Sequence, residues 1–349
     1  MNKIRAVGLL SGGLDSSIAC RLIQNQGIEV KAINFYTGFC TTDFRRQVNR
    51  QKAKGKVYAN ESLQSAASLG VEIDYIDISA TYIKDVLMQP KHGYGSAINP
   101  CLDCRGYMLA GAKKYMEDAG AQFVFTGEVL GQRPMSQYRK ALDIVAEESG
   151  LGRLLVRPLS AQLLPPTIPE EMGWIDRAKL AGISGRSRKE QYRLAEELGV
   201  SVYSQPAGGC CSLADVSYGK KMRDLLNHLE NGNVPSLDDV ILLKVGRHFR
   251  PSETLKVVVG RDEVENKFLE RYSGGPRAVL TSIDVVGPVV IAEGLLEPAE
   301  LRTAAAITAR YADHEGAETI RIKYEYKDTS GIMEVHPLTS QQIDLWRVC

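Results

Sequence analysis

The chain contains 349 residues, 44% of them hydrophobic and 24% charged, and its formal net charge is +1. This length predicts two or three domains, and the composition is typical of a soluble globular protein. No apolar run is long enough to cross a bilayer, and residues 1–5 lead into a strand pattern rather than a signal peptide. We therefore expect a cytoplasmic protein with no membrane partner.

Strand and helix patterns alternate along the first 160 residues. Strands are expected at residues 4–10, 29–35, 72–78 and 122–126. Helices are expected at residues 16–25, 47–69, 105–119 and 136–148. Such alternation is typical of an α/β protein with a doubly wound parallel sheet, whose ligands bind at the carboxyl ends of the strands.

The segment after the first expected strand has the sequence Ser-Gly-Gly-Leu-Asp-Ser-Ser, residues 11–17. A glycine pair between a strand and a helix lets backbone amides approach an anion, and the helix N-terminus adds N–H donors. A Walker A loop is excluded because no Gly-Lys-Ser/Thr follows, and a dinucleotide fingerprint because the third glycine is missing. Asp15 would position Mg²⁺. We expect ATP to be held by Ser11, Gly12, Gly13, Asp15, Ser16 and Ser17. A plain glycine-rich turn is the alternative.

A second polar loop, residues 126–137, follows the fourth expected strand and would complete the nucleotide site. Its candidate ATP-binding residues are Gly127, Glu128, Gln132, Ser136 and Gln137. Ser136 and Gln137 would donate to phosphate oxygens, and Glu128 would meet Mg²⁺ or an orienting amide. The alternative is a plain strand-to-helix loop with Ser136 as the helix N-cap.

Four of the seven cysteines occur in two short motifs. Cys101 and Cys104 form a C-x-x-C before an expected helix, where the helix dipole favours the thiolate, and Cys210 and Cys211 follow a glycine pair. Three thiolates without a clear fourth ligand suit a 4Fe-4S cluster with one open iron, whereas structural zinc takes four ligands. Catalytic persulfide chemistry, zinc with both vicinal cysteines or with His92, and packing thiols remain alternatives.

The rest of the chain divides into two further regions. Helices are expected at residues 170–180, 188–198 and 215–229, and strands at 240–245, 254–259, 278–286 and 319–326, after a turn-rich linker at 231–235. The predicted domains are therefore residues 1–160, a helical extension at 161–230 that carries the third cluster cysteine, and an α+β domain at 237–349.

Basic residues in the last region are candidates for RNA contacts. They are Arg247, His248, Arg250, Lys256 and Arg261, with Phe249 available for base stacking. A solvated face is the alternative, because acidic residues are interleaved with them.

Taken together, these motifs resemble a known family. Residues 11–17 resemble the PP-loop of ATP pyrophosphatases (adenine nucleotide alpha hydrolase-like fold), enzymes that cleave ATP between its α and β phosphates. With the Thr-Gly-Glu loop, Pro-Cys-x-x-Cys at 100–104 and Gly-Gly-Cys-Cys-x-Leu-x-Asp at 208–215, residues 1–230 resemble tRNA thiouridine synthetases that use a three-cysteine iron-sulfur cluster, the 4-thiouridine synthetase type. Residues 243–266 resemble the small RNA-binding domain of ribosome quality-control proteins. No THUMP or rhodanese domain is recognised.

The resemblance implies an ATP-dependent tRNA sulfurtransferase. ATP, with Mg²⁺, would adenylate a uridine carbonyl, and sulfur bound at the unique iron of a 4Fe-4S cluster would displace AMP. Asp15, Cys101 and Cys104 would be catalytic, and the cluster would be held by Cys101, Cys104 and one of Cys210 or Cys211. The implied partners are tRNA and a sulfur donor, either inorganic sulfide or a cysteine desulfurase, and a homodimer is left open. The alternatives are a PP-loop ligase with an amine nucleophile and no cluster, and a zinc-containing RNA-binding adaptor.

Overall fold

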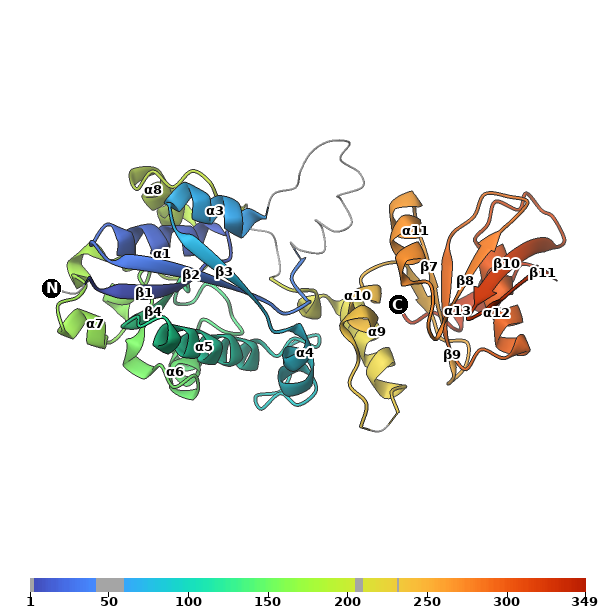
Figure 1. Cartoon of the computed structure of the whole chain (residues 1–349), viewed down its shortest axis with the longest axis horizontal. Helices are drawn as coiled ribbons and strands as arrows, with labels where there is room; N and C mark the ends of the chain where they lie inside the picture. The colour runs from blue at the N-terminus through green and yellow to red at the C-terminus, as the bar shows by residue number, and fades with distance from the viewer. Residues whose placement is uncertain (1–2, 42–59, 205–209, 231) are drawn as a thin grey trace. The chain divides into compact units, whose positions relative to one another are not determined.

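The computed structural model describes residues 3–41, 60–204, 210–230 and 232–349 (Figure 1). The chain divides into two compact units. The N-terminal unit comprises residues 1–37, 58–95 and 99–208, and the C-terminal unit comprises residues 38–57, 96–98 and 209–349. Within the described ranges, no helix combines the length and apolarity needed to span a bilayer.

A parallel five-stranded sheet with the order β3-β2-β1-β4-β5 forms the centre of the N-terminal unit. Its strands are β1 (Arg5–Leu9), β2 (Glu29–Tyr36), β3 (Glu72–Asp77), β4 (Phe123–Thr126) and β5 (Leu155–Val156). The strand order reverses at β1, which pairs with β2 on one side and β4 on the other. The predicted α/β class is confirmed, and in open α/β sheets such a reversal is where ligands bind, at the carboxyl ends of the strands, here β1 and β4.

Helices cover both faces of this sheet (Figure 1). They are α1 (Leu14–Gln24), α3 (Glu61–Leu69), α4 (Ser79–Tyr82), α5 (Cys101–Asp118), α6 (Arg139–Glu148), α7 (Ile168–Glu171) and α8 (Lys189–Glu197). Alternate strand residues enter two separate cores: Ala6 and Phe125 pack with α1, α3 and α8, whereas Val7 and Val124 pack with α5 and α6. The first part of the expected helix at 47–69 lies outside the described residues.

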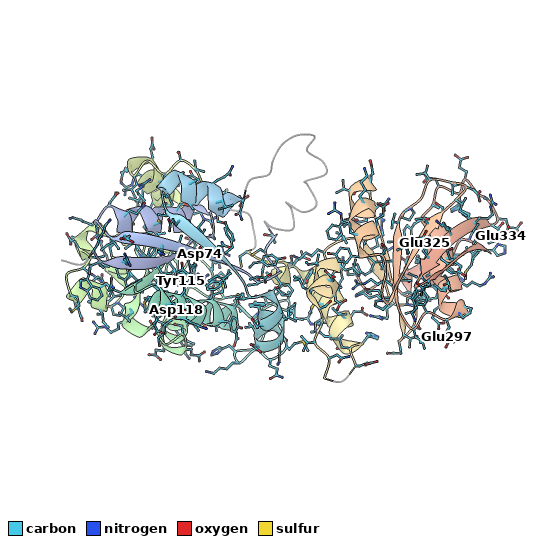
Figure 2. The ribbon with its side chains drawn as sticks, viewed as in Figure 1. Asp74, Tyr115, Asp118, Glu297, Glu325 and Glu334 are labelled. Atoms are coloured by element: carbon cyan, nitrogen blue, oxygen red, sulfur yellow. The ribbon has the colours of Figure 1, made fainter. Side chains whose placement is uncertain are left out.

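Side-chain bonds add to the packing of α5 on the sheet. The Tyr115 hydroxyl on α5 donates to the Asp74 carboxylate on β3 (Figure 2). Burial, then the hydrogen bond and the charge of Asp74, raise the pKa of Tyr115 to about 12. This contact fixes α5, whose first turn carries Cys101 and Cys104.

Residues 161–204 belong to the N-terminal unit rather than to a separate extension. Ile175, Leu180 and Ile183 are buried in the same core as α1, so this segment completes one face of the domain. The helix expected at 170–180 ends early: α7 stops at Glu171, before Gly173, whose φ of +67° is not helical.

The C-terminal unit is built on a six-stranded antiparallel sheet with the order β11-β10-β8-β9-β7-β6. Its strands are β6 (Arg247–Phe249), β7 (Leu255–Val259), β8 (Arg277–Ser282), β9 (Val290–Gly294), β10 (Ile320–Tyr326) and β11 (Thr329–Val335). Its helices are α9 (Val216–Asn227), α10 (Leu237–Leu242), α11 (Glu263–Leu269), α12 (Pro298–Arg310) and α13 (Ser340–Asp344). Helix α12 packs on one face of the sheet, and α10 and α11 pack on the other.

The strand expected at residues 240–245 is wrong, because residues 240–242 are the last turn of α10 and residues 243–245 form the turn after it. Ser236 and Asp239 form a capping box that starts the helix. Helices α9 and α10, which flank the expected linker at 231–235, are joined by a hydrogen bond. The Tyr218 hydroxyl on α9 donates to the Val240 carbonyl at 2.8 Å, which ties α9 to α10 within one unit.

Candidate functional site

The glycine pair after β1 forms the turn into α1, as the PP-loop motif predicts. Gly12 has a φ of +79°, and a Cβ there would lie 2.5 Å from the Ser62 backbone nitrogen. Gly13 is the N-cap of α1 with extended backbone, and a Cβ there would meet nothing closer than Ser11 Oγ at 3.5 Å. Gly12 is therefore required by the fold. Gly13 leaves an open approach to the helix N-terminus, where N–H groups favour an anion.

The serines of the motif organise this turn. Ser16 Oγ and Ser17 Oγ each donate to the Gly13 carbonyl at 3.0 Å, and Ser11 Oγ lies 3.2 Å from Ser16 Oγ. Ser11 is exposed and Ser17 is fully buried. These hydrogen bonds bring the predicted residues together in one turn. Ser17 lies on the buried side of this turn and holds the Gly13 carbonyl.

The loop after β4 approaches the start of α1 closely. A Cβ on Gly127 would lie 2.5 Å from the Ser16 backbone nitrogen and 2.6 Å from the Asp15 carbonyl carbon, so this position requires glycine. The loops after β1 and β4 are therefore in close contact at the first turn of α1.

Asp15 lies at the centre of that site and is oriented by two amides. Gln132 Nε2 donates to Asp15 Oδ2 at 2.7 Å, and Gln191 Nε2 on α8 donates to Gln132 Oε1 at 2.9 Å. Asp15 Oδ1 is buried and has no hydrogen-bond partner within the described part of the chain. Burial raises the pKa of Asp15, although Gln132, Arg188 and Arg133 oppose the shift. An orphaned carboxylate oxygen of this kind fits a Mg²⁺ ligand.

Glu128 has a different role from the one expected. It is buried and forms ion pairs with Arg105 of α5 and with Arg157, at 2.9 and 3.0 Å. Burial alone would raise the pKa of Glu128, but the charges and hydrogen bonds of Arg105 and Arg157 outweigh it and lower the pKa to about 2. Both carboxylate oxygens are occupied by guanidinium groups, so a direct Mg²⁺ role for Glu128 is not supported by the geometry.

Ser136 and Gln137 are buried at the end of the same loop. The Gly131 N–H donates to the Gln137 carbonyl at 2.6 Å, which closes the loop, and Gln137 Oε1 is buried without a hydrogen-bond partner among the described residues. Ser136 is not the helix N-cap, because α6 begins after Tyr138.

Cys101 and Cys104 lie in the first turn of α5, which starts four residues earlier than expected because it includes the C-x-x-C. Asn99 Nδ2 donates to Cys101 Sγ at 3.0 Å, and an N–H donor of this kind stabilises negative charge on sulfur. Arg105, the next residue after Cys104, is held by Glu128. The turn that carries the two thiols is therefore held to the loop after β4. His92 pairs instead with Glu148, at 3.0 Å.

Cys210 and Cys211 belong to the C-terminal unit, where Cys211 precedes a 3₁₀ turn and Asp215 caps α9 by accepting from the Tyr218 N–H at 2.8 Å. Cys210 is exposed and Cys211 is half-buried. No group of three or more His, Cys, Asp or Glu side chains with a metal-binding arrangement occurs in the portion of the chain that the structure describes. Cys40, which the sequence motifs did not single out, forms a β-bridge with Cys211. Its place in the sequence, four residues after β2 ends at Tyr36, was the available signal.

Three of the six predicted RNA contacts are not at the surface. His248, Phe249 and Lys256 are buried, so they are unavailable to phosphates or bases. Arg250 is held by the Asp224 carboxylate at 2.8 Å. Arg261 is half exposed but bonded to Glu265, and Arg247 lies 5.2 Å over the Tyr311 ring. The structure thus argues against Lys256 and Arg250 as RNA contacts.

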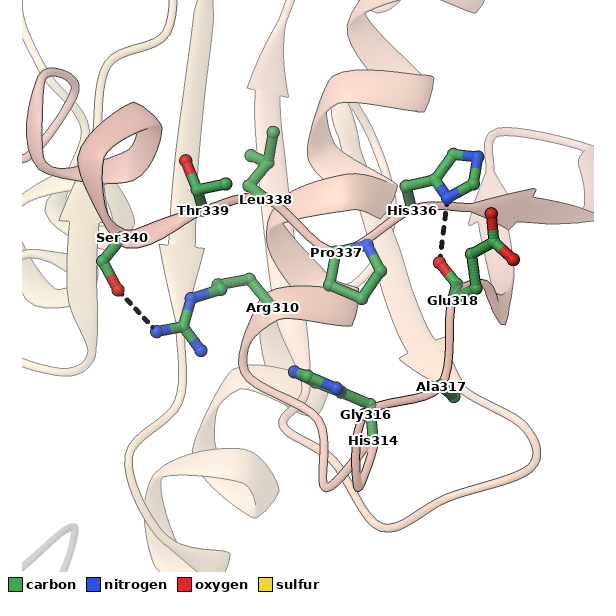
Figure 3. Close-up of a pocket in the computed structure, with 10 residues that line it drawn as sticks. All are labelled: Arg310, His314, Gly316, Ala317, Glu318, His336, Pro337, Leu338, Thr339 and Ser340. Atoms are coloured by element: carbon green, nitrogen blue, oxygen red, sulfur yellow. Dashed lines mark hydrogen bonds between the residues drawn. The ribbon is translucent and has the colours of Figure 1, made fainter.

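A pocket lined by polar residues lies elsewhere in the C-terminal unit, between the end of α12 and the segment from β11 to α13 (Figure 3). Its volume is about 450 Å³, and its charged or titratable lining residues are Arg310, His314, Glu318 and His336. Arg310 donates to Ser340 Oγ at 2.9 Å and, within the described residues, pairs with no carboxylate. The His336 ring bonds the Glu318 carbonyl at 2.9 Å through Nδ1, which leaves Nε2 for another partner.

Two parts of the chain match known protein families. Residues 4–147 match the family described as tRNA methyl transferase HUP domain, and residues 246–347 match the NFACT protein RNA binding domain. The tRNA-specific 2-thiouridylase MnmA of Thermotoga petrophila is 24% identical over 251 residues, 69% of this chain and 64% of that protein. The resemblance to PP-loop tRNA thiolation enzymes is confirmed. The same enzyme from Azorhizobium caulinodans is 26% identical over 254 residues, 70% of this chain and 59% of that protein. The chain thus spans less than two thirds of these relatives.

The chain is similar to the solved structure of a 4-thiouridine synthetase–RNA complex with bound ATP. The TM-score is 0.32, and the identity is 20% over 56% of this chain and 51% of that one. The U34-tRNA thiolase NcsA from Methanococcus maripaludis with its [4Fe-4S] cluster has a TM-score of 0.32 and 15% identity over 70% of this chain and 74% of that one.

Proposed function

We propose that this chain is an ATP-dependent tRNA thiolase that replaces a uridine carbonyl oxygen with sulfur. The observation that carries the proposal is the junction of the β1 and β4 loops at Asp15, whose Oδ1 is buried without a hydrogen-bond partner among the described residues. The relatives called tRNA-specific 2-thiouridylase supply the substrate class. The RNA-binding family match at residues 246–347 supports a nucleic-acid substrate.

The first chemical step in this proposal is adenylation of the uridine oxygen. Backbone N–H groups at Gly13 and the first turn of α1 hold the phosphates of ATP, and Asp15 Oδ1 is the carboxylate oxygen offered to Mg²⁺. The carbonyl oxygen attacks the α phosphate, and pyrophosphate leaves. Gln132 acts as a positioning residue, because its amide fixes the Asp15 carboxylate.

The second step is displacement of AMP by sulfur. Cys101 and Cys104 on one helix turn are soft thiolate donors whose type and spacing fit an iron-sulfur cluster, and the proposal takes one of Cys210 and Cys211 as the third ligand. A bound 4Fe-4S cluster with one open iron would supply a site for sulfide. Asn99 and the N-terminus of α5 would stabilise the thiolate charge. Inorganic sulfide or a cysteine desulfurase remains the proposed sulfur donor.

RNA docking is assigned in this proposal to the C-terminal unit, and Arg310 is the guanidinium we take as a phosphate contact. Its charge has no carboxylate partner within the described residues, whereas Arg250, Arg261 and Arg277 of the same unit each form ion pairs. An uncompensated guanidinium beside imidazoles attracts phosphate.

The decisive experiment is anaerobic purification followed by iron and sulfide quantitation and a thiolation assay on unmodified tRNA. We expect about four irons and four sulfides per chain at full loading and ATP-dependent formation of thiouridine. Cys101→Ala and Cys104→Ala should each lose iron and activity, and only one of Cys210→Ala and Cys211→Ala should do so. Full thiolation by an iron-free Cys101→Ala, Cys104→Ala double variant would reject the cluster and the persulfide alternative together. ATP-dependent attachment of an amine to tRNA would favour the ligase alternative.

A further inference from the structure

Cys40 lies directly opposite Cys211 in the C-terminal unit. The two residues form an antiparallel bridge, and the Ser212 N–H donates to the Phe39 carbonyl at 2.8 Å. This bond joins the residue before Cys40 to the residue after Cys211. The cysteines therefore occupy a non-hydrogen-bonded pair, the closer of the two antiparallel arrangements.

This pairing has the backbone spacing of a disulfide. Partners in a non-hydrogen-bonded pair have Cα atoms about 4.5 Å apart, and disulfides join residues whose Cα atoms are about 4.4–6.8 Å apart. Side chains of directly opposed residues project to the same face. Cys211 has extended backbone, with φ −146° and ψ 160°, so the neighbouring Cys210 is directed to the other face.

Both segments are held by the body of the unit. Phe39 is fully buried and packs edge-on against Tyr218, with ring centroids 6.3 Å apart. Lys244 Nζ donates to the Gly38 carbonyl at 2.6 Å, and Leu213 is fully buried. The pairing of the cysteines is therefore a property of the packed unit.

The pair is also accessible, since Cys40 and Cys211 are only half-buried. Cys20 offers a contrast, because it is buried in the core of the N-terminal unit and burial raises the pKa of its thiol to about 12. A small oxidant can reach the first two thiols, and Cys20 is protected.

We propose that Cys40 and Cys211 form a reversible disulfide when the protein meets a hydroperoxide. The Cys211 thiolate attacks one peroxide oxygen, the O–O bond breaks, and a sulfenic acid and hydroxide result. The Cys40 sulfur then attacks the sulfenic sulfur and expels its oxygen as water with the Cys40 proton. In sum, two thiols and one hydrogen peroxide give one disulfide and two waters, and a dithiol reductant restores both thiols.

The bond would withdraw Cys211 from sulfur chemistry. Cys211 is one of the two candidates for the third sulfur ligand, so its oxidation would stop thiolation until reduction. This consequence rests on the proposed function, whereas the disulfide itself rests on the backbone pairing alone.

The test treats the full chain with a small excess of hydrogen peroxide, blocks remaining thiols by alkylation, and maps linked peptides by mass spectrometry without reduction. Matched variants resolve the vicinal pair: Cys210→Ser retains Cys211, and Cys211→Ser retains Cys210. We expect a linked Cys40 peptide in the unsubstituted chain and in Cys210→Ser, and none in Cys211→Ser or Cys40→Ser. Linkage that persists in Cys211→Ser, or Cys40 alkylated throughout, would overturn the proposal.

A thiolation assay on the same samples tests separately whether the disulfide controls thiolation. After peroxide has been removed, a dithiol should restore activity to the unsubstituted chain, while it should change the activity of peroxide-treated Cys40→Ser little. Equal recovery in both proteins would reject control by this bond. If the chain thiolates tRNA normally while the Cys40–Cys211 disulfide is intact, Cys211 does not take part in thiolation. The disulfide proposal itself would not be affected.

Discussion

Gln132 Nε2 donates a hydrogen bond of 2.7 Å to Asp15 Oδ2 and so joins the loop after β4 to the first turn of α1. Gln191 of α8 supports the same amide from behind, at 2.9 Å. Two residues distant in sequence therefore set the direction of the carboxylate. The other oxygen of the carboxylate, Oδ1, is buried and has no hydrogen-bond partner within the described residues.

Asp15→Asn is expected to separate stability from turnover. Burial raises the pKa of Asp15, so the folded protein favours the protonated carboxyl. This group therefore stabilises the folded protein at low pH. That stabilisation is lost as pH rises through the folded pKa. At neutral pH the neutral asparagine should keep or raise the melting temperature. Loss of the negative oxygen should slow pyrophosphate release by about 100-fold. Thermal melts and a pyrophosphate assay measure both, and a lowered melting temperature with normal turnover would contradict the assignment.

Glu128→Gln should instead damage the fold. Removing one partner of a buried ion pair costs about 3–5 kcal/mol, because the buried Arg157 would be left beside a neutral amide and the partly exposed Arg105 would lose its partner. The folded pKa is lowered to about 2, so the stabilisation is present above the unfolded value near 4.5 and disappears as pH falls toward 2. Urea unfolding at several pH values checks this. The difference between the variant and the unsubstituted chain should shrink below pH 4.5, and a constant difference would argue against the ion pair.

How far the sequence predicts this site depends on how local each feature is. The PP-loop was predictable because its glycines, Asp15 and its serines act within one strand-to-helix turn. The partners of Glu128 lie 23 and 29 residues away, so no local pattern revealed that its carboxylate is occupied. The sequence motifs therefore located both loops, but the role of the Glu128 carboxylate depends on tertiary packing.

The RNA-contact prediction failed at Lys256 for a related reason. A basic residue in a short strand is expected to alternate toward solvent, but every residue of β7 is buried because helices cover both faces of the sheet. Lys256 lies opposite Glu293 of β9, and the charge of Glu293 is the largest effect that opposes the lowering of the Lys256 pKa by burial. A buried lysine thus has the same sequence signature as a surface contact.

Gly13→Val should abolish ATP binding without unfolding the protein. The extended backbone of Gly13 accepts a β-branched residue, and an added Cβ meets only ordinary contacts, so the side chain would fill the approach to the α1 N-terminus. Gly12→Ala is the contrasting variant, since its positive φ and the 2.5 Å approach to the Ser62 nitrogen predict misfolding. Calorimetric ATP titration and circular dichroism distinguish the two. Undiminished ATP affinity in a folded Gly13→Val would remove the phosphate cradle from the proposal.

Arg310→Ala should weaken tRNA binding through the loss of one phosphate contact. Arg310 is uncompensated by any carboxylate within the described residues, so its removal should reduce the slope of log affinity against log salt by about one and leave ATP affinity unchanged. Arg321→Ala is the matched control, because this arginine of the same unit is exposed and already paired with Asp284. Binding titrations at several salt concentrations with both variants decide the matter. Equal salt slopes in Arg310→Ala and Arg321→Ala would mean that the pocket does not meet the RNA backbone, and Arg247, whose guanidinium faces the Tyr311 ring rather than a carboxylate, would become the next residue to test.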